Sequence, residues 1–310
     1  MFSLELSRYA LNRMVDNASQ RPSFCAVWGM RIALFSGTLV VVGIFLHRLL
    51  GLPTPILLNV IKVGFAGGAV ALLLGLAAVL HIWFSGRKGT GMTLVAILVS
   101  LALFAWPAVY LPAWRDLPPI NDVTTDLHAP PEMAALARLR GPGANPTEYP
   151  GDAFAEMQVV SYPDLQPFFI PRSASEAFEL AADAARRLHF RIVAEVPPGD
   201  DSDRPGIIEA VDRTLIMGFY DDVVIRVLGD EQSAQIDVRS ASRYGQHDLG
   251  RNASRVRAIF HELRTRLETT VPAATGTRGK HKGGKGAASK KQKADDRGRA
   301  GRRNERDRGR

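Results

Sequence analysis

The sequence of 310 residues contains one cysteine, Cys25, which excludes an internal disulfide framework and any cysteine-rich metal site. It also lacks the motifs HExxH, GxxxxGK[ST] and GxGxxG, which mark zinc hydrolases, phosphate-binding loops and dinucleotide-binding folds; the GxxxxGK at residues 279–285 is followed by glycine instead of Ser or Thr. Asp200, Asp201 and Asp203 do not form an EF-hand, because no loop that begins at one of them has a glycine at the sixth position together with a glutamate at the twelfth. We therefore predict no cofactor and no metal site.

Lysine is absent from residues 114–270. This segment contains 17 arginines and 25 acidic residues, so its net charge is −8. Residues 1–113 carry +6 and residues 271–310 carry +10, so the overall charge of +8 comes from the two ends of the chain. A domain that binds nucleic acid needs at least one basic face. The acidic middle of the chain therefore argues against nucleic acid as a partner.

Three long apolar runs follow a cytoplasmic N-terminal segment that we assign to residues 1–31. The runs lie within residues 32–113, at about 32–52, 60–84 and 91–111. Each is long enough to cross a hydrocarbon core of roughly 30 Å as a helix. We predict three transmembrane helices, with the lipid bilayer as a partner.

Small residues recur on one face of the second run, a pattern typical of closely packed membrane helices. They are Gly64, Gly68, Ala71 and Gly75. His47 and Arg48 near the end of the first helix, and Lys62 in the predicted first turn of the second, are interpreted as interfacial anchors.

Basic residues around the three runs predict which way the chain faces. The cytoplasmic loops of membrane proteins carry an excess of Lys and Arg. Six basic residues lie in the N-terminal flank and in the loop after the second run, against two at the edges of the first loop. We expect the inner (cytoplasmic) membrane of a bacterium, a cytoplasmic N-terminus and a periplasmic domain after residue 113.

An α+β domain is predicted over residues 154–270, after a proline-rich linker at 114–153 that contains a short helix at 131–139. The predicted order is β-α-β-β-β-β-α, an antiparallel sheet in a two-layer sandwich with both helices on one face. The strands are expected at 154–162, 190–196, 207–219, 222–228 and 234–242, and the helices at 174–189 and 250–267.

Local signals support this assignment. Ser173 and Glu176 have the spacing of a capping box at the start of the first helix. Ile236 and Val238 alternate with Asp237 and Arg239, which is typical of a half-buried strand.

The last segment, residues 271–310, contains too few apolar residues to form a core, and we predict a disordered basic tail. All 14 of its Lys and Arg residues lie in 278–310. If the domain is periplasmic, anionic lipid or an envelope polymer is the expected partner of this tail.

Three stretches carry a resemblance to a known family. They are LPPINDVTTD (117–126), IIEAVDRTLIMGFYDDVVIRV (207–227) and IDVRSASRYGQHDLGRNASRVRAI (236–259). In this order they resemble the bacterial family of domains of unknown function numbered 1499 (DUF1499), over about residues 117–268. The resemblance implies a location in the cell envelope, as in membrane-anchored members, but it implies no activity.

Eight charged residues are the candidate polar cluster: Asp122, Asp126, Asp212, Arg213, Asp221, Asp222, Arg239 and Arg243. We favour the interpretation that they form a structural Arg–carboxylate network, because arginine binds carboxylates in a bidentate manner. The neighbours His247 and Asp248 could form a base and its orienting carboxylate, but we expect a turn with Asp248 near the N-terminus of the last helix.

Two functions fit these features. The first is an envelope binding or scaffold module that recognises a lipid, a cell-wall fragment or a protein partner. The second is a hydrolase-like enzyme that acts on an envelope substrate through the Asp/Arg cluster. We favour the first, because the sequence shows no nucleophile in a recognisable motif, and no catalytic residue is assigned.

Overall fold

The computed structural model describes residues 21–199 and 204–269. The predictions for the N-terminal segment 1–20, for Asp200, Asp201 and Asp203, and for the basic tail after residue 269 lie outside these residues and stay predictions.

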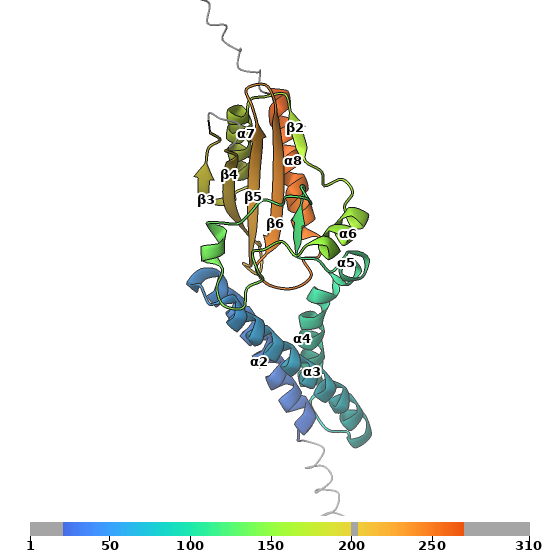
Figure 1. The fold of residues 1–310 in the computed structure, drawn as a ribbon. Helices are drawn as coiled ribbons and strands as arrows, with labels where there is room; N and C mark the ends of the chain where they lie inside the picture. The colour runs from blue at the N-terminus through green and yellow to red at the C-terminus, as the bar shows by residue number, and fades with distance from the viewer. Residues whose placement is uncertain (1–20, 200–203, 270–310) are drawn as a thin grey trace, which may run out of the picture. The chain divides into compact units, whose positions relative to one another are not determined.

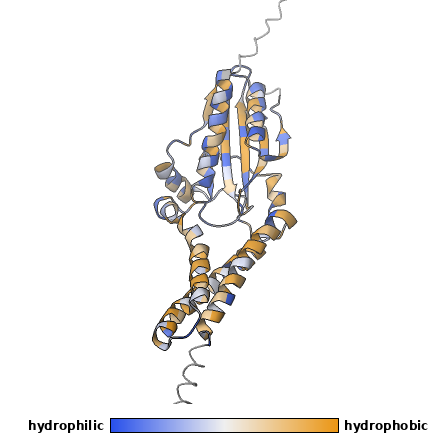
Figure 2. Ribbon diagram, turned by 180° about the vertical axis from the view of Figure 1, so that it is seen from behind, coloured by the Kyte–Doolittle hydropathy of each residue, from blue (hydrophilic) through white to orange (hydrophobic). Residues whose placement is uncertain are grey.

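Three helices are long and apolar enough to cross a membrane, as predicted. They are α2 (Phe24–Leu50), α3 (Thr54–Ser85) and α4 (Thr90–Ala108), which a short helix α5 (Leu111–Asp116) follows. Figure 2 shows apolar residues along all three. Two helices begin earlier than predicted, so Lys62 lies in the third turn of α3 rather than the first.

The small residues of α3 form the contact surface of the helix bundle, as the sequence predicts. Gly64, Gly68, Ala71 and Gly75 are all buried. A Cβ atom at Gly64 would collide with Val40 of α2, whereas one at Gly75 would lie 2.8 Å from Ile97 Cγ1 of α4. Glycine is therefore required where α3 approaches its two neighbours.

A six-stranded antiparallel sheet forms the centre of the domain after α5. Five strands run in the order β1-β6-β5-β4-β3, and β2 also pairs with β6. The strands are β1 (Asp122–Thr124), β2 (Phe168–Ile170), β3 (Arg191–Val196), β4 (Gly206–Arg213), β5 (Tyr220–Gly229) and β6 (Ala234–Ser242).

Two long helices, α7 (Ala174–Arg187) and α8 (Arg251–Thr269), cover one face of the sheet (Figure 1). Their apolar side chains share one core with Ile208, Val223, Ile225 and Val238 of the sheet. The Ser173 hydroxyl accepts a hydrogen bond from the Glu176 backbone N–H, which confirms the predicted cap of α7. The two-layer α+β architecture is the predicted one.

Residues 154–162 do not form the predicted strand. They belong to α6 (Asp152–Ser161), and the strand that precedes α7 is β2 instead. Phe154 and Met157, three residues apart, both pack against the main core, which requires the helical spacing. The Gln158 side chain lies between α6 and β1, donating to Thr124 O at 2.6 Å and accepting from Thr124 N at 3.0 Å.

Residues 114–153, predicted as a linker, contribute to the sheet and to its second face. β1 pairs with β6, and the 3₁₀ helix η1 (Leu136–Leu139) lies where the short helix was expected. Met133 and Leu136 pack on Val211, Val224 and Ala241 of the sheet. This covering segment, residues 125–150, explains why β6 is buried on both faces rather than half-buried as predicted.

The close packing of α3 can be tested by replacing Gly75 with leucine. Overpacking against Ile97 should lower the free energy of unfolding by about 1–3 kcal/mol. Unfolding of the detergent-solubilised protein by increasing SDS measures the loss. Gly91→Leu is the matched control, because no atom lies within 4 Å of a Cβ at that position. An equal loss in both variants would contradict the predicted contact.

Candidate functional site: the ion-paired faces of the sheet

The charged residues of β4, β5 and β6 divide between the two faces of the sheet, because side chains alternate along a strand. Asp212 and Asp221 point toward the helices with Ile208 and Val223. Asp222, Arg239 and their neighbours point toward the covering segment with Val224 and Ala241. The eight predicted residues therefore do not form one cluster.

Arg239 makes the largest number of contacts between the sheet and the covering segment. Its guanidinium donates to both carboxylate oxygens of Asp122, at 3.1 and 2.7 Å. It also donates to the carbonyl oxygens of Pro131 at 3.0 Å and of Thr147 at 2.7 Å, and it lies over the Tyr149 ring. One buried side chain of β6 thus holds β1 and both ends of the covering segment.

The Asp122–Arg239 pair lies almost entirely out of water, with side-chain exposures of 4% and 2%. Burial raises the pKa of Asp122 above its usual range, whereas the hydrogen bonds and charge of Arg239 act in the opposite direction. Arg239 therefore offsets part of the effect of burial on the Asp122 carboxyl group.

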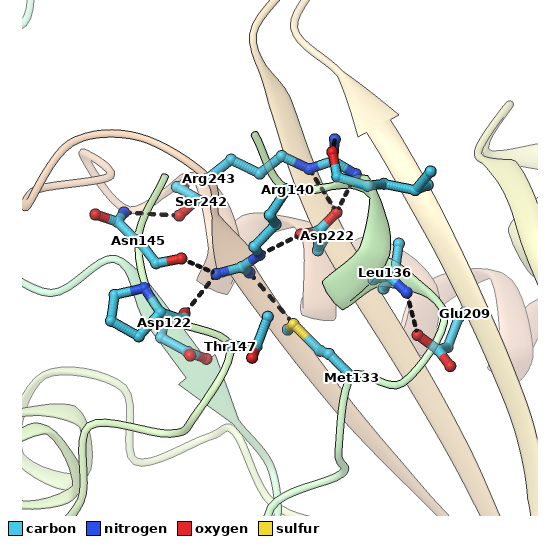
Figure 3. Close-up of polar contacts among 12 residues, drawn as sticks. Asp122, Met133, Leu136, Arg140, Asn145, Thr147, Glu209, Asp222, Ser242 and Arg243 are labelled. Atoms are coloured by element: carbon cyan, nitrogen blue, oxygen red, sulfur yellow. Dashed lines mark hydrogen bonds and ion pairs between the residues drawn. The ribbon is translucent and has the colours of Figure 1, made fainter. Parts of the chain in front are cut away.

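Asp222 on the same face binds two arginines (Figure 3). Arg140 donates to Oδ2 at 2.8 Å, and Arg243 donates to Oδ1 at 2.8 and 2.6 Å. Arg140 also donates to the carbonyl oxygens of Asn145 at 2.7 Å and Pro146 at 2.5 Å, which closes the loop after η1. The loop 141–146 is therefore held by the same carboxylate that anchors Arg243.

Two further contacts complete this face. Glu209 of β4 accepts hydrogen bonds from the backbone N–H groups of Ala135 and Leu136, at 2.9 and 2.8 Å, and so caps the start of η1. Arg226 joins Asp126 and Asp237, both at 2.8 Å. Although partial burial acts the other way, backbone N–H groups and Arg226 lower the pKa of Asp126 below its usual value.

Arg255 of α8 organises the charged residues on the helix face. It donates to Asp212 at 2.7 Å, to Asp221 at 2.6 Å and to the Ser240 hydroxyl at 2.9 Å. Burial works against its charge, but the two carboxylates raise the pKa of Arg255. The two carboxylates converge on one guanidinium, so Arg255 offsets one of their two negative charges within the fold.

Arg213 is separated from the other seven predicted residues. It lies at the end of β4 and donates to the carbonyl oxygen of Arg48 in α2 at 2.7 Å. Sequence reasoning missed Arg140, Arg226 and Arg255, which bind four of the predicted aspartates. Arg226 and Arg255 lie inside the family motifs, but nothing in their spacing indicates which carboxylate each would bind.

Two cavities, of about 320 and 450 Å³, adjoin the covering segment. Tyr149 and Glu148 line both, Asp122 and Arg140 line the smaller one, and Arg239 lines the larger one. The Tyr149 hydroxyl is buried, and none of the residues that the structure describes forms a hydrogen bond with it. Burial, together with the charge of Asp122, raises the pKa of Tyr149 to about 12, so the phenol is neutral at physiological pH.

Asp248 caps α8, as the sequence analysis favoured. Its carboxylate accepts hydrogen bonds from the backbone N–H groups of Gly250 and Asn252, both at 2.8 Å. The neighbouring His247 accepts from the Leu249 backbone N–H at 3.0 Å. In the described part of the chain, no three His, Cys, Asp or Glu residues come close enough together to hold a metal ion.

A double-mutant cycle on Asp122 and Arg239 tests the ion pair between β1 and β6. Each single variant, Asp122→Asn or Arg239→Met, should lower the free energy of unfolding by about 3–5 kcal/mol, because the partner charge stays buried and unpaired. The double variant should lose clearly less than the sum of the two single losses. Urea unfolding of the full-length protein in nanodiscs measures these values.

The matched control is the surface pair Arg257–Asp164, which is 2.6 Å long but has side-chain exposures of 45% and 52%. The same cycle on this pair should give a coupling of about 0–1 kcal/mol. Similar couplings for the buried and the exposed pair would contradict the structural role of Arg239.

Comparison with known proteins supports the family resemblance. The family described as "Protein of unknown function (DUF1499)" matches residues 122–263, which contain all six strands and most of α8. The match begins at Asp122 and includes Arg239 and Arg255, so it contains the main ion pairs of both faces. Neither the curated proteins nor the solved structures gave a match. Residues 122–263 are thus a DUF1499 domain, which this chain carries after three helices that could span a membrane.

Proposed function

We propose that this protein is a binding module of the bacterial cell envelope. In this proposal α2, α3 and α4 span the inner membrane, and the DUF1499 domain takes a polar envelope molecule on its periplasmic side. The observation that carries the proposal is the pair of cavities that meet at Tyr149, on a face that buried ion pairs hold in place.

The chemistry of the cavity walls indicates the kind of ligand. Arg239 is paired with Asp122, whereas Arg140 shares Asp222 with Arg243. These five groups therefore carry a net charge of only +1. Glu132 and Glu148 add carboxylates at the walls, and the neutral Tyr149 phenol adds a hydroxyl. Such walls favour neutral or cationic molecules with many hydroxyl or amine groups, such as a sugar–peptide fragment of the cell wall.

The same contacts favour binding over catalysis. General acid–base catalysis needs a carboxyl group that can exchange a proton with a substrate. Asp122, Asp212, Asp221 and Asp222 all form ion pairs with arginines, so arginine donors within the fold already occupy their carboxylate oxygens. The alternative of an envelope hydrolase would require one of these pairs to open.

The ends of the helix bundle support the proposed orientation. The Ser23 backbone N–H donates to Lys88 O at 2.9 Å, so the N-terminal flank and the α3–α4 loop lie at the same end. Arg21, Arg87 and Lys88 therefore gather at one end of the bundle, and α4 ends at the other. By the positive-inside rule, the basic end faces the cytoplasm and the domain faces the periplasm.

Fusions to alkaline phosphatase, which is active only after export, test this orientation. We expect activity for a fusion after residue 269, which follows three crossings, and no activity for a fusion after residue 88. Phosphatase activity after residue 88 and none after residue 269 would contradict the proposed orientation.

Binding is tested by calorimetry on the full-length protein in nanodiscs, with a disaccharide–peptide fragment of the cell wall as the probe. Tyr149→Phe should weaken binding by about threefold to tenfold, the loss expected for one hydrogen bond of 0.5–1.5 kcal/mol. Glu148→Gln should weaken the binding of an amine-bearing fragment.

Glu231→Gln, on the exposed β5–β6 turn, is the control and should bind like the unmodified protein. Unchanged affinity in the cavity variants, or no binding of the fragment, would contradict the proposal. Chemical cleavage of the fragment during the experiment would favour the hydrolase alternative.

The basic segment 278–310 is proposed to add contact with anionic lipid or an envelope polymer, because its charge is opposite to theirs. Deletion of residues 272–310 should then reduce binding to anionic vesicles at low salt and leave binding at high salt unchanged.

A further inference from the structure

The turn between β4 and β5 is bonded to the last turn of α2. Arg48 donates to the carbonyl oxygen of Thr214 at 3.0 Å, and Arg213 donates back to the carbonyl oxygen of Arg48 at 2.7 Å. The His47 ring nitrogen Nε2 lies 3.2 Å from the carbonyl oxygen of Gly218. These three contacts fix the turn, residues 214–219, beside the end of a candidate membrane span.

The end of α2 belongs at a membrane surface. The helix has 27 residues and is about 40 Å long at 1.5 Å per residue, which exceeds a hydrocarbon core of roughly 30 Å. Leu49 and Leu50, in its last turn, are 61% and 74% exposed in the protein. The following residues, Gly51–Pro53, reverse the chain into α3. The α2 end thus lies at the boundary between lipid tails and headgroups.

The β4–β5 turn presents two large apolar side chains at this level. Leu215 is 80% exposed and Ile216 is 55% exposed, whereas the apolar residues of the preceding strand, β4, are buried or half-buried. Neither belongs to a core cluster of the described residues. An exposed apolar pair beside a membrane span continues the apolar surface of that span.

Two connections hold the β4–β5 turn next to the helix bundle. α4 and α5 connect the bundle to the domain through the backbone, and the bonds of Arg48 and Arg213 connect the end of α2 to β4. Exposed aromatic residues also occur in the connection, with Trp114 at 62% and Tyr110 at 44%. Aromatic side chains of this kind are favoured at the headgroup level.

We propose that Leu215 and Ile216 insert into the headgroup–acyl boundary of the membrane that α2, α3 and α4 span. The occupant of this apolar pair is lipid, and the bonds between α2 and the turn hold it at the correct depth. The proposal rests on the three helices spanning a bilayer, and it is independent of any ligand at Tyr149.

Site-directed spin labelling of the full-length protein in nanodiscs tests the insertion. Cys25→Ser removes the native thiol, and Leu215→Cys or Ile216→Cys then places a single label. Both labels should show high accessibility to oxygen, which partitions into lipid, and several-fold lower accessibility to a water-soluble nickel chelate. A fluorophore attached at the same cysteine should also be quenched by lipids that carry a nitroxide near the headgroup.

Gln232→Cys is the matched control, because residue 232 is exposed on the β5–β6 turn, at the opposite end of β5. Its label should show the reverse preference. Thermal midpoints close to that of the unmodified protein would show that the labelled variants fold. Equal access of the nickel chelate to positions 215 and 232 would overturn the proposal.

A second copy of this chain is the competing occupant of the apolar pair, and the number of chains in each disc distinguishes it from lipid. Low access of the nickel chelate to position 215 in discs that hold one chain supports insertion into lipid. If access of the nickel chelate falls only when a disc holds two chains, the lipid assignment is overturned and position 215 lies in an interface between copies.

Discussion

The ion pair between Arg239 and Asp122 determines how the rest of the domain is arranged. Arginine has five N–H donors in a planar fork, so one side chain can bind a carboxylate and two carbonyl oxygens at the same time. Arg239 does this with Asp122, Pro131 and Thr147. In the described part of the chain, the covering segment contributes only Met133 and Leu136 to the buried residues of the second core cluster, so polar contacts such as those of Arg239 supply much of its attachment to the sheet.

The buried ion pairs of this domain all use arginine, and residues 114–270 contain no lysine. A lysine ammonium is a point charge that cannot bind a carboxylate with two parallel hydrogen bonds. Arg239, Arg243 and Arg255 each bind at least one carboxylate in a buried position. A buried ion pair adds little net stability compared with an apolar pair, but leaving either partner alone is strongly unfavourable. We infer that these pairs select one arrangement of the covering segment over others.

The sequence predicted the elements whose signals are local, and it missed those that depend on distant contacts. Ser173 caps α7, Asp248 caps α8 and β6 spans the predicted residues 234–242, since caps and alternation need only neighbouring residues. The helix α6 was predicted as a strand, because its helical form depends on core contacts of Phe154 and Met157 and on the bonds of Gln158 to Thr124. Asp237 and Arg239 of β6 look solvent-exposed in the sequence, yet both are buried by a segment more than 80 residues away.

The sequence indicated the candidate residues by their residue type and motif, but it did not indicate which residue each of them would bind. Charge and motif selected eight residues, and each of the five aspartates among them is bonded to an arginine. Their division between two faces could not be deduced, because it depends on the register of β4, β5 and β6. The cavities at Tyr149 could not be predicted either, since residues 141–151 show only turn signals in the sequence.

Hydrogen exchange tests the central claim most directly. The claim is that buried ion pairs keep the covering segment as stably folded as the strands of the sheet. The backbone amides of Thr124, Ala135, Leu136 and Asn145 all donate hydrogen bonds to side chains or to the backbone of other elements. If the ion pairs hold the segment in place, these amides will exchange as slowly as those at the centre of β5 and will be released only by global unfolding. Exchange at the rate of an unstructured loop, with β5 still protected, would contradict the account.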